Sequence, residues 1–154
     1  MKKHFLFSTE RRGHCLAMVF FCALLPTLCF ALQVSTGPNG SNVQAVHDLG
    51  YTGQGVSVGL ISANHALDSH EAFAGQAFLY DATGTNPYDP VNHDTSVGGI
   101  ICSRGGASYP DDKGTAPDAV LHSVKVSNNG SVSTAYITDA LDYLLGQQCQ
   151  VVVT

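Results

Sequence analysis

The distribution of apolar and polar residues along the chain predicts short buried strands that alternate with amphipathic helices. Residues 56–61 are apolar except for Ser57, a pattern typical of a strand that is covered on both faces of a parallel sheet. The expected elements are, in chain order, a short helix at 42–49, a strand at 56–61, a strand at 77–80, a helix from Asp94 that ends at Gly105, a strand at 120–126, a helix at about 131–145 and a strand that begins at Val151. This alternation favours an α/β fold with a mostly parallel sheet.

The two longer helices each have one apolar side. In the helix that begins at Asp94, we expect Val97, Ile100 and Ile101 to face the core. Gly146 is suited to cap the C-terminus of the next helix. The residues expected to face the core in that helix are Val132, Tyr136, Ile137, Ala140, Leu141, Leu144 and Leu145.

The first 31 residues have the organisation of a secretory signal peptide. Basic residues precede an almost uncharged segment at 15–31, and Cys29 and Ala31 place small residues at positions −3 and −1 of a cleavage site. An uncleaved membrane anchor is the alternative, but an apolar run of about 17 residues is at the lower limit for a transmembrane helix. The chain is therefore divided into a signal peptide at 1–31, a linker at 32–42 and a domain at 43–154. We expect a secreted protein, extracellular or periplasmic, with no stable membrane span after cleavage.

Cleavage after Ala31 leaves 123 residues with a net charge of −8, from three basic and eleven acidic side chains. This acidity disfavours nucleic acid and anionic membranes as partners. Only Cys102 and Cys149 remain in this part of the chain. The sequence is compatible either with a disulfide between them or with two separate thiols.

Three segments of the chain carry motifs in a characteristic order. The first is the Gly-x-Gly turn and apolar strand at 53–61, followed by Asp-Ser-His-Glu at 68–71. The second is His-Asp-Thr-Ser-Val-Gly-Gly at 93–99, and the third is Gly-Thr-Ala-Pro-Asp-Ala at 114–119, with Val-Lys-Val at 124–126. In this order they resemble the Gly-x-Gly turn, the His-Gly-Thr-His-Val-Ala-Gly segment and the Gly-Val-Ala-Pro turn of the subtilase family of serine peptidases.

The resemblance implies a subtilisin-like serine endopeptidase that acts on peptide or protein substrates. Its fold is then a parallel-sheet three-layer sandwich, truncated here after about the fourth strand. By resemblance, His93 is the general base that takes the proton from a serine hydroxyl, and an aspartate at the end of the first strand orients it. The nucleophile serine of the family is expected beyond residue 154, so we expect the chain as given to be inactive.

Ser62 stands where the resemblance places that aspartate. A serine hydroxyl can accept a hydrogen bond from imidazole, but it carries no charge to stabilise imidazolium. In subtilisin, loss of the aspartate alone lowers turnover by about 3 × 10⁴. Asp68 or Asp94 are alternative sources of a carboxylate, although Asp94 is expected to point elsewhere because it adjoins His93. The alternative function is therefore a non-catalytic, exported binding or scaffold protein, a pseudoenzyme.

Two rival motifs fit the sequence less well. Gly-x-Ser-x-Gly at 55–59 matches a nucleophile elbow, but in such an elbow the serine follows a strand and does not lie within one. His65, Asp68 and His70, with His93 farther on, are potential metal ligands, but a spacing of five does not place the first two histidines on one helical face. His70 instead resembles the family's structural histidine. We therefore expect no metal site and no cofactor, and a structural calcium ion stays an open alternative that no sequence feature supports.

Overall fold

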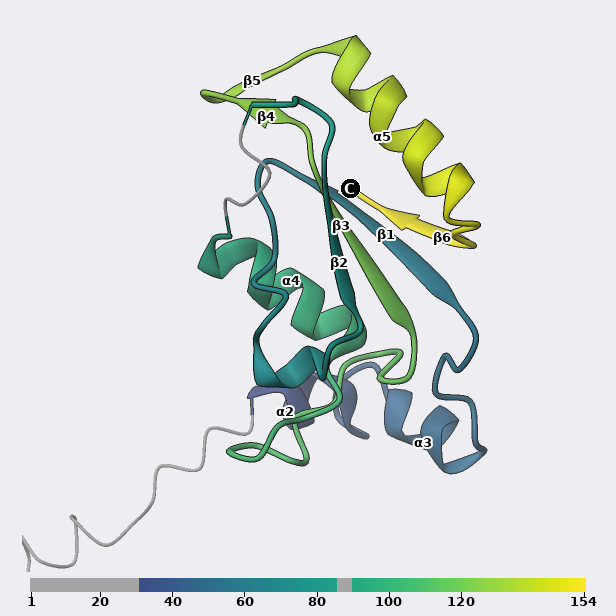
Figure 1. Cartoon of the computed structure of the whole chain (residues 1–154). Helices are drawn as coiled ribbons and strands as arrows, with labels where there is room; N and C mark the ends of the chain where they lie inside the picture. The colour runs from purple at the N-terminus through teal and green to yellow at the C-terminus, as the bar shows by residue number, and fades with distance from the viewer. Residues whose placement is uncertain (1–30, 86–89) are drawn as a thin grey trace, which may run out of the picture.

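The computed structural model describes residues 31–85 and 90–154, which form a parallel four-stranded sheet with helices on both faces (Figure 1). The sheet order is β2-β3-β1-β6. The elements are α2 (Ala31–Thr36), α3 (Val43–Asp48), β1 (Ser57–Ser62), η1 (Glu71–Phe73), β2 (Ala77–Asp81), α4 (Asn92–Cys102), β3 (Val120–Lys125), β4 (Ser127–Asn128), β5 (Ser131–Val132), α5 (Thr134–Gly146) and β6 (Val151–Val153). The predicted α/β class with a parallel sheet is confirmed.

Strand β1 lies inside the sheet, between β3 and β6. Its register with β3 runs from Ser57 opposite Val120 to Ser62 opposite Lys125. Strand β2 ends with Asp81 opposite the same Lys125. The carboxyl ends of these three strands therefore lie side by side at one edge of the sheet.

The two faces of the sheet have separate apolar cores, because successive residues of a strand point to opposite faces. Val58 and Leu60 of β1 belong to the cluster beneath α4, together with Leu121 of β3. Ile61 belongs to the cluster beneath α5, together with Leu144 of that helix. Burial on both faces explains why the sequence of β1 is almost continuously apolar.

Helix α4 differs from the prediction at both ends. It begins at Asn92, two residues before the predicted start, and ends at Cys102, three residues before Gly105. Val97 and Ile101 pack against the core as expected. Ile100 is 53% exposed, so its predicted inward position is wrong. It lies on the side of α4 that faces away from the sheet.

The helix predicted to begin at 131 is preceded by a small hairpin. Strands β4 and β5 pair across Asn129 and Gly130, which both have positive φ angles, 49° and 78°. Consecutive positive angles are typical of the tight turns that connect hairpin strands. Helix α5 therefore starts at Thr134, where the Ser133 hydroxyl caps it by accepting the Tyr136 backbone N–H at 3.3 Å.

The apolar side of α5 is only partly buried. Ala140 and Leu144 are buried as predicted. Leu141 and Leu145 are 42% and 72% exposed, and Val132 is 56% exposed in β5, so their predicted core positions are wrong. Within the described residues, the covered part of the helix is the side that faces β1, β2 and β3, where Tyr143 stacks on Tyr80 of β2.

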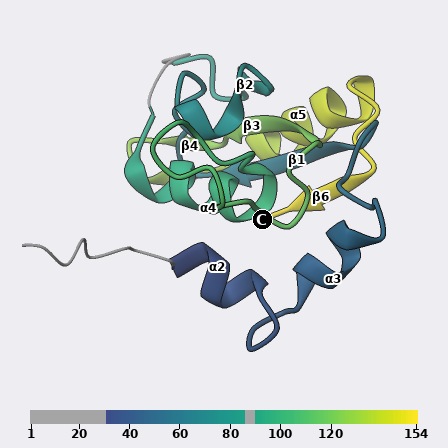
Figure 2. The same ribbon diagram turned by 90° about the horizontal axis from the view of Figure 1, so that it is seen from below.

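The segment that precedes the sheet carries α2 and α3, which lie below the amino-terminal ends of the strands in Figure 1 and to one side of the sheet when seen from below (Figure 2). Helix α2 occupies part of the predicted linker at 32–42. The hydroxyls of Ser35 and Thr36 both donate to the carbonyl of Leu32, at 3.0 and 2.8 Å, which holds this first turn together. The predicted signal peptide lies, apart from Ala31, outside the described residues. Within 31–85 and 90–154, no helix is long and apolar enough to span a membrane.

The two cysteines of the described chain are free thiols on opposite faces of the sheet. Cys102 is in the cluster beneath α4, and Cys149 packs against the cluster beneath α5. Burial raises the pKa of the Cys102 thiol to about 12 and also raises the pKa of Cys149. Of the two alternatives that the sequence allowed, the fold supports separate thiols, because the sheet lies between them.

The closest approach of α5 to the sheet depends on a residue without a side chain. A Cβ at Gly59 in β1 would lie 2.5 Å from Cδ1 of Leu144, which is itself fully buried. We expect Gly59→Ala to lower the free energy of unfolding by about 1–3 kcal/mol, because the core would be overpacked. Urea unfolding followed by circular dichroism measures this change.

The matched control is Gly99→Ala in α4, where an added Cβ meets nothing within 4 Å. Replacing a glycine within a helix by alanine is expected to raise stability by about 0.5–1 kcal/mol. Equal unfolding midpoints for Gly59→Ala and the parent would show that Leu144 can move aside without cost.

Candidate active site

A row of polar side chains crosses the carboxyl edge of the sheet. Asp81, Lys125 and Ser62 are opposite one another in register on β2, β3 and β1. Adjacent strands lie about 4.8 Å apart, so each of these residues neighbours the next. Lys125 is only 4% exposed, and its backbone position in β3 is between Asp81 of β2 and Ser62 of β1. Polar groups cluster here because the interior of β1 is covered on both faces and only its end is open to polar contacts.

Ser62 pairs with Asp94, which is on the first turn of α4. The Ser62 Oγ–H donates to Asp94 Oδ1 at 2.5 Å, and Asp94 is 1% exposed. A short hydroxyl-to-carboxylate contact is the geometry of a charge-assisted hydrogen bond. Asp94 therefore points to the end of β1, and in the described part of the chain it makes no hydrogen bond to His93, as expected from its position on the helix. Its carboxylate occupies the end of β1, the place where the family resemblance puts an aspartate.

The second oxygen of that carboxylate has a different environment. Asp94 Oδ2 is buried and has no hydrogen-bond partner among the described residues. An unpartnered buried oxygen costs free energy. The Ser62 hydroxyl is therefore the donor on which the Asp94 carboxylate depends, and because its hydrogen points to Asp94, its lone pairs remain available as acceptors.

His93 is exposed on the same first turn of α4. Neighbouring residues of a helix point about 100° apart, so His93 and Asp94 face different directions. In the described part of the chain, no hydrogen bond joins His93 to Ser62. The structure therefore brings His93 and Ser62 to adjacent elements, but it pairs Ser62 with the neighbour of His93. The role of His93 as general base stays a prediction.

His65 is a buried residue of the site region that sequence reasoning considered only as a metal ligand. It is fully buried, and its Nε2 donates to the carbonyl of Tyr80 at 2.9 Å. Its backbone carbonyl accepts the Val91 N–H, and the Leu67 N–H donates to Thr95 Oγ1. The bonds to Val91 and Thr95 join the loop after β1 to the start of α4, where Asp94 lies next to Ser62. No local sequence signal distinguishes such a residue from an exposed loop histidine.

The remaining predicted candidates lie apart from this pair. His70 caps η1, because its Nδ1 accepts the Ala72 backbone N–H at 3.2 Å. Asp68 is half-buried in the loop, and within the described residues it has no hydrogen bond to His93. Among residues 31–85 and 90–154, no three His, Cys, Asp or Glu side chains lie close enough together to hold a metal ion. Ser57 lies within β1 and not at a strand-to-helix turn, as an elbow nucleophile would.

The chain is similar to known proteases in sequence and in fold. The chain is 41% identical over 75 residues to alkaline protease 1 of Emericella nidulans, a match that covers 48% of this chain and 17% of the relative. Its fold is similar to that of a cold adapted subtilisin-like serine proteinase, with a TM-score of 0.50, 25% identity and coverage of 62% of this chain and 34% of the other. It is also similar to the Clostridium perfringens CspB protease, with a TM-score of 0.56, 20% identity and coverage of 71% and 31%. No protein-family model matches the chain.

These comparisons confirm the resemblance to subtilisin-like proteases and the subtilisin-like fold predicted from the sequence. The chain spans 34% and 31% of the two solved structures and 17% of the curated relative. The activity of a whole protein is therefore a matter of proposal.

The Ser62–Asp94 hydrogen bond can be tested by removing its donor. We expect Ser62→Ala to lower the free energy of unfolding by about 1–3 kcal/mol, because it leaves both oxygens of a buried carboxylate without a side-chain donor. Urea unfolding monitors the loss.

Ser96→Ala is the matched control on α4. Ser96 is exposed, and within the described residues its hydroxyl bonds to the Asn92 carbonyl of its own helix alone, at 2.8 Å. We expect a change within about 0.5 kcal/mol. If both variants unfold at the same urea concentration, the short bond contributes nothing to stability.

Proposed function

We propose that this chain is the amino-terminal part of a secreted subtilisin-like serine endopeptidase domain that hydrolyses peptide or protein substrates. The observation that carries the proposal is a carboxylate at the carboxyl end of a buried parallel strand, with His93 next to it on the following helix. Open α/β sheets place their active sites at this edge. The similarity to alkaline protease 1 and to two solved proteases supports the class of reaction.

In the proposed enzyme, His93 accepts the proton of a serine nucleophile from a later part of the domain, beyond residue 154. The carboxylate that orients such a histidine in subtilases comes from the strand end, where this chain has Ser62. We propose that Asp94 supplies the negative charge instead, at the strand end where its carboxylate accepts the Ser62 hydroxyl. This chemistry needs no metal or cofactor. Export follows from the proposed signal peptide at 1–31 and suits the acidity of the remaining chain.

The exchange of the aspartate for Ser62 also supports a second candidate function. The chain is then part of a non-catalytic, exported binding or scaffold protein. The specific observation is that His93 faces solvent and has no hydrogen bond to Ser62 or Asp94 in the described residues. The two candidates differ in whether a completed domain reacts as a serine hydrolase.

The test is to sequence the DNA downstream of codon 154, to express the domain that it would complete, and to treat the product with a fluorophosphonate probe and a fluorogenic peptide. We expect covalent labelling of a serine and hydrolysis of the peptide. His93→Ala is expected to lower turnover by at least about 10²-fold, the contribution of a general base. Absence of labelling in the folded, full-length protein would favour the binding or scaffold function.

His47→Ala is the matched control for that experiment. His47 is on α3, where its Nε2 bonds to the Thr115 carbonyl at 3.0 Å, below the opposite edge of the sheet. We expect its turnover to stay within about twofold of the parent. Equal losses in both variants would indicate a general effect on folding and not a role of His93 in the reaction.

A second experiment tests the source of the carboxylate. In the family motif quoted above, glycine follows the catalytic histidine, at the position of Asp94. We expect the double variant Ser62→Asp with Asp94→Gly to raise turnover of the full-length enzyme by at least about tenfold, because the aspartate returns to the strand end. Peptide hydrolysis measures the change.

The single variant Ser62→Asp is the informative comparison. It would place a second carboxylate next to the buried Asp94, and two carboxylates at hydrogen-bond distance repel unless one is protonated. We therefore expect a smaller gain, or a loss, together with lower stability. If the single and double variants are equally active, Asp94 does not occupy the orienting position.

A further inference from the structure

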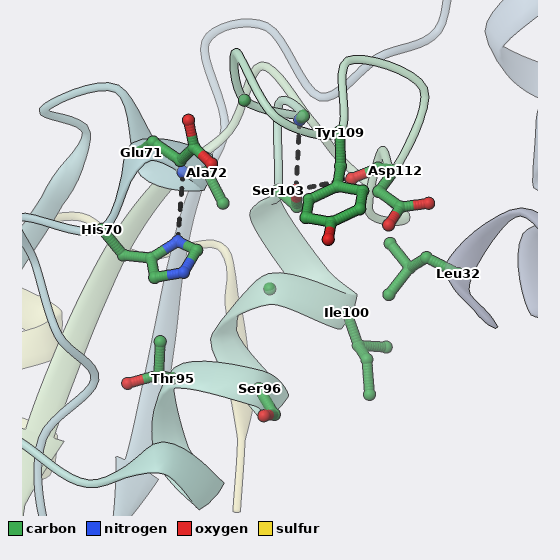
Figure 3. Close-up of a pocket in the computed structure, with 13 residues that line it drawn as sticks. Leu32, His70, Glu71, Ala72, Thr95, Ser96, Ile100, Ser103, Tyr109 and Asp112 are labelled. Carbon is green, nitrogen blue, oxygen red and sulfur yellow. Dashed lines mark hydrogen bonds between the residues drawn. The ribbon is translucent and has the colours of Figure 1, made fainter. Parts of the chain in front are cut away.

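A pocket of about 310 Å³ lies on the outer side of α4, away from the sheet (Figure 3). One wall is formed by Thr95, Ser96 and Ile100 of α4, and the opposite wall by the loop that carries Tyr109. Leu32 of α2 lies at its edge. The exposure of Ile100, which was unexpected from the helical pattern, is explained by its position in this wall.

The pocket has acidic side chains but no lysine or arginine in its lining. The carboxylate of Glu71 already has a hydrogen-bond partner, because its Oε2 accepts the Ala107 N–H at 2.9 Å. The second acid, Asp112, has its backbone carbonyl bonded to the Ser103 hydroxyl at 2.6 Å. Within the described residues, no hydrogen bond or ion pair is made by the Asp112 carboxylate itself. Apolar walls beside an available carboxylate suit a group with an apolar body and a positive charge.

The turn that carries Leu32 is closed by hydrogen bonds among residues after the predicted cleavage site. Its carbonyl accepts the hydroxyls of Ser35 and Thr36. The next turn is joined on by the Ser41 N–H, which donates to the Ser35 carbonyl at 2.8 Å. These hydrogen bonds therefore use no residue that cleavage would remove.

We infer that this pocket binds the chain's own amino terminus, which is formed on Leu32 when the signal peptide is removed. Hydrolysis of the Ala31–Leu32 peptide bond by a signal peptidase consumes one water and leaves a carboxylate on Ala31 and an ammonium group on Leu32. The Leu32 side chain contacts the apolar wall, and the new ammonium pairs with the Asp112 carboxylate. Before cleavage the same nitrogen is an uncharged amide, so this ion pair forms only after processing.

Binding of the amino terminus at this pocket would link signal-peptide removal to the candidate active site, because one wall of the pocket is α4, which also carries His93 and Asp94. The link rests on the proposed export and on cleavage after Ala31. The pocket itself requires only a free amino group on Leu32. These two parts can be tested separately.

The experiment uses the chain released from a removable amino-terminal fusion, so that Leu32 is the first residue. A limiting amount of an amine-reactive reagent is added near neutral pH, and labelling of the terminal peptide is followed by mass spectrometry. A paired ammonium reacts more slowly, because the carboxylate stabilises its protonated form. We expect Asp112→Asn to increase the labelling rate about threefold, the size of an exposed ion pair, and 1 M salt to reduce the difference.

Asp111→Asn is the matched control, because it removes the same charge from the adjacent residue, which does not line this pocket. We expect its labelling rate to equal that of the parent, and we expect Asp112→Glu to restore slow labelling. Equal labelling rates in the parent and in Asp112→Asn would overturn the proposal that the pocket binds the Leu32 ammonium. Circular dichroism of Asp112→Asn confirms that a faster rate does not come from unfolding.

Sequencing of the amino terminus of the secreted protein tests the link to processing. We expect it to begin at Leu32. Another first residue would contradict the export proposal and the link to processing, while the labelling rates of the released chain still decide whether the pocket binds the Leu32 ammonium.

Discussion

The structure depends on the burial of β1 on both of its faces and along both of its edges. Strands β3 and β6 flank it, and the clusters beneath α4 and α5 cover it. Its interior positions must therefore be apolar, or lack a side chain where Leu144 approaches Gly59. Polar chemistry is excluded from the strand and can begin only at its carboxyl end, where Ser62 stands. The location of the candidate site follows from this constraint.

The charge at that end comes from a different element than the family resemblance implies. The strand end carries the Ser62 hydroxyl, and α4 supplies the carboxylate of Asp94. The hydrogen bond between them joins the carboxyl end of β1 to the first turn of α4. A buried carboxylate is costly unless it has donors. Lys125 and Ser62, adjacent in register, bring a positive charge and a hydroxyl donor to this edge. A carboxylate is therefore present at the end of β1, but it belongs to α4 and not to the strand.

Helix α4 joins three parts of the molecule through three of its sides. Val97 and Ile101 complete the core, Asp94 closes the sheet edge, and Ile100 lines the pocket at α2. The core, the sheet edge and the pocket therefore share one packed helix. This arrangement explains why an apolar residue of the helix is left on the outer side.

The sequence by itself determined the order of strands and helices, the parallel sheet and the family resemblance, because apolar spacing, turn residues and motifs are local properties of the chain. It also located Ser62 at the strand end and His93 at the helix start. Only the tertiary structure decided that Asp94, 32 residues from Ser62, turns towards it, and that His65 is buried. Those outcomes depend on how the loop after β1 is clamped to α4, which no spacing within a single segment encodes.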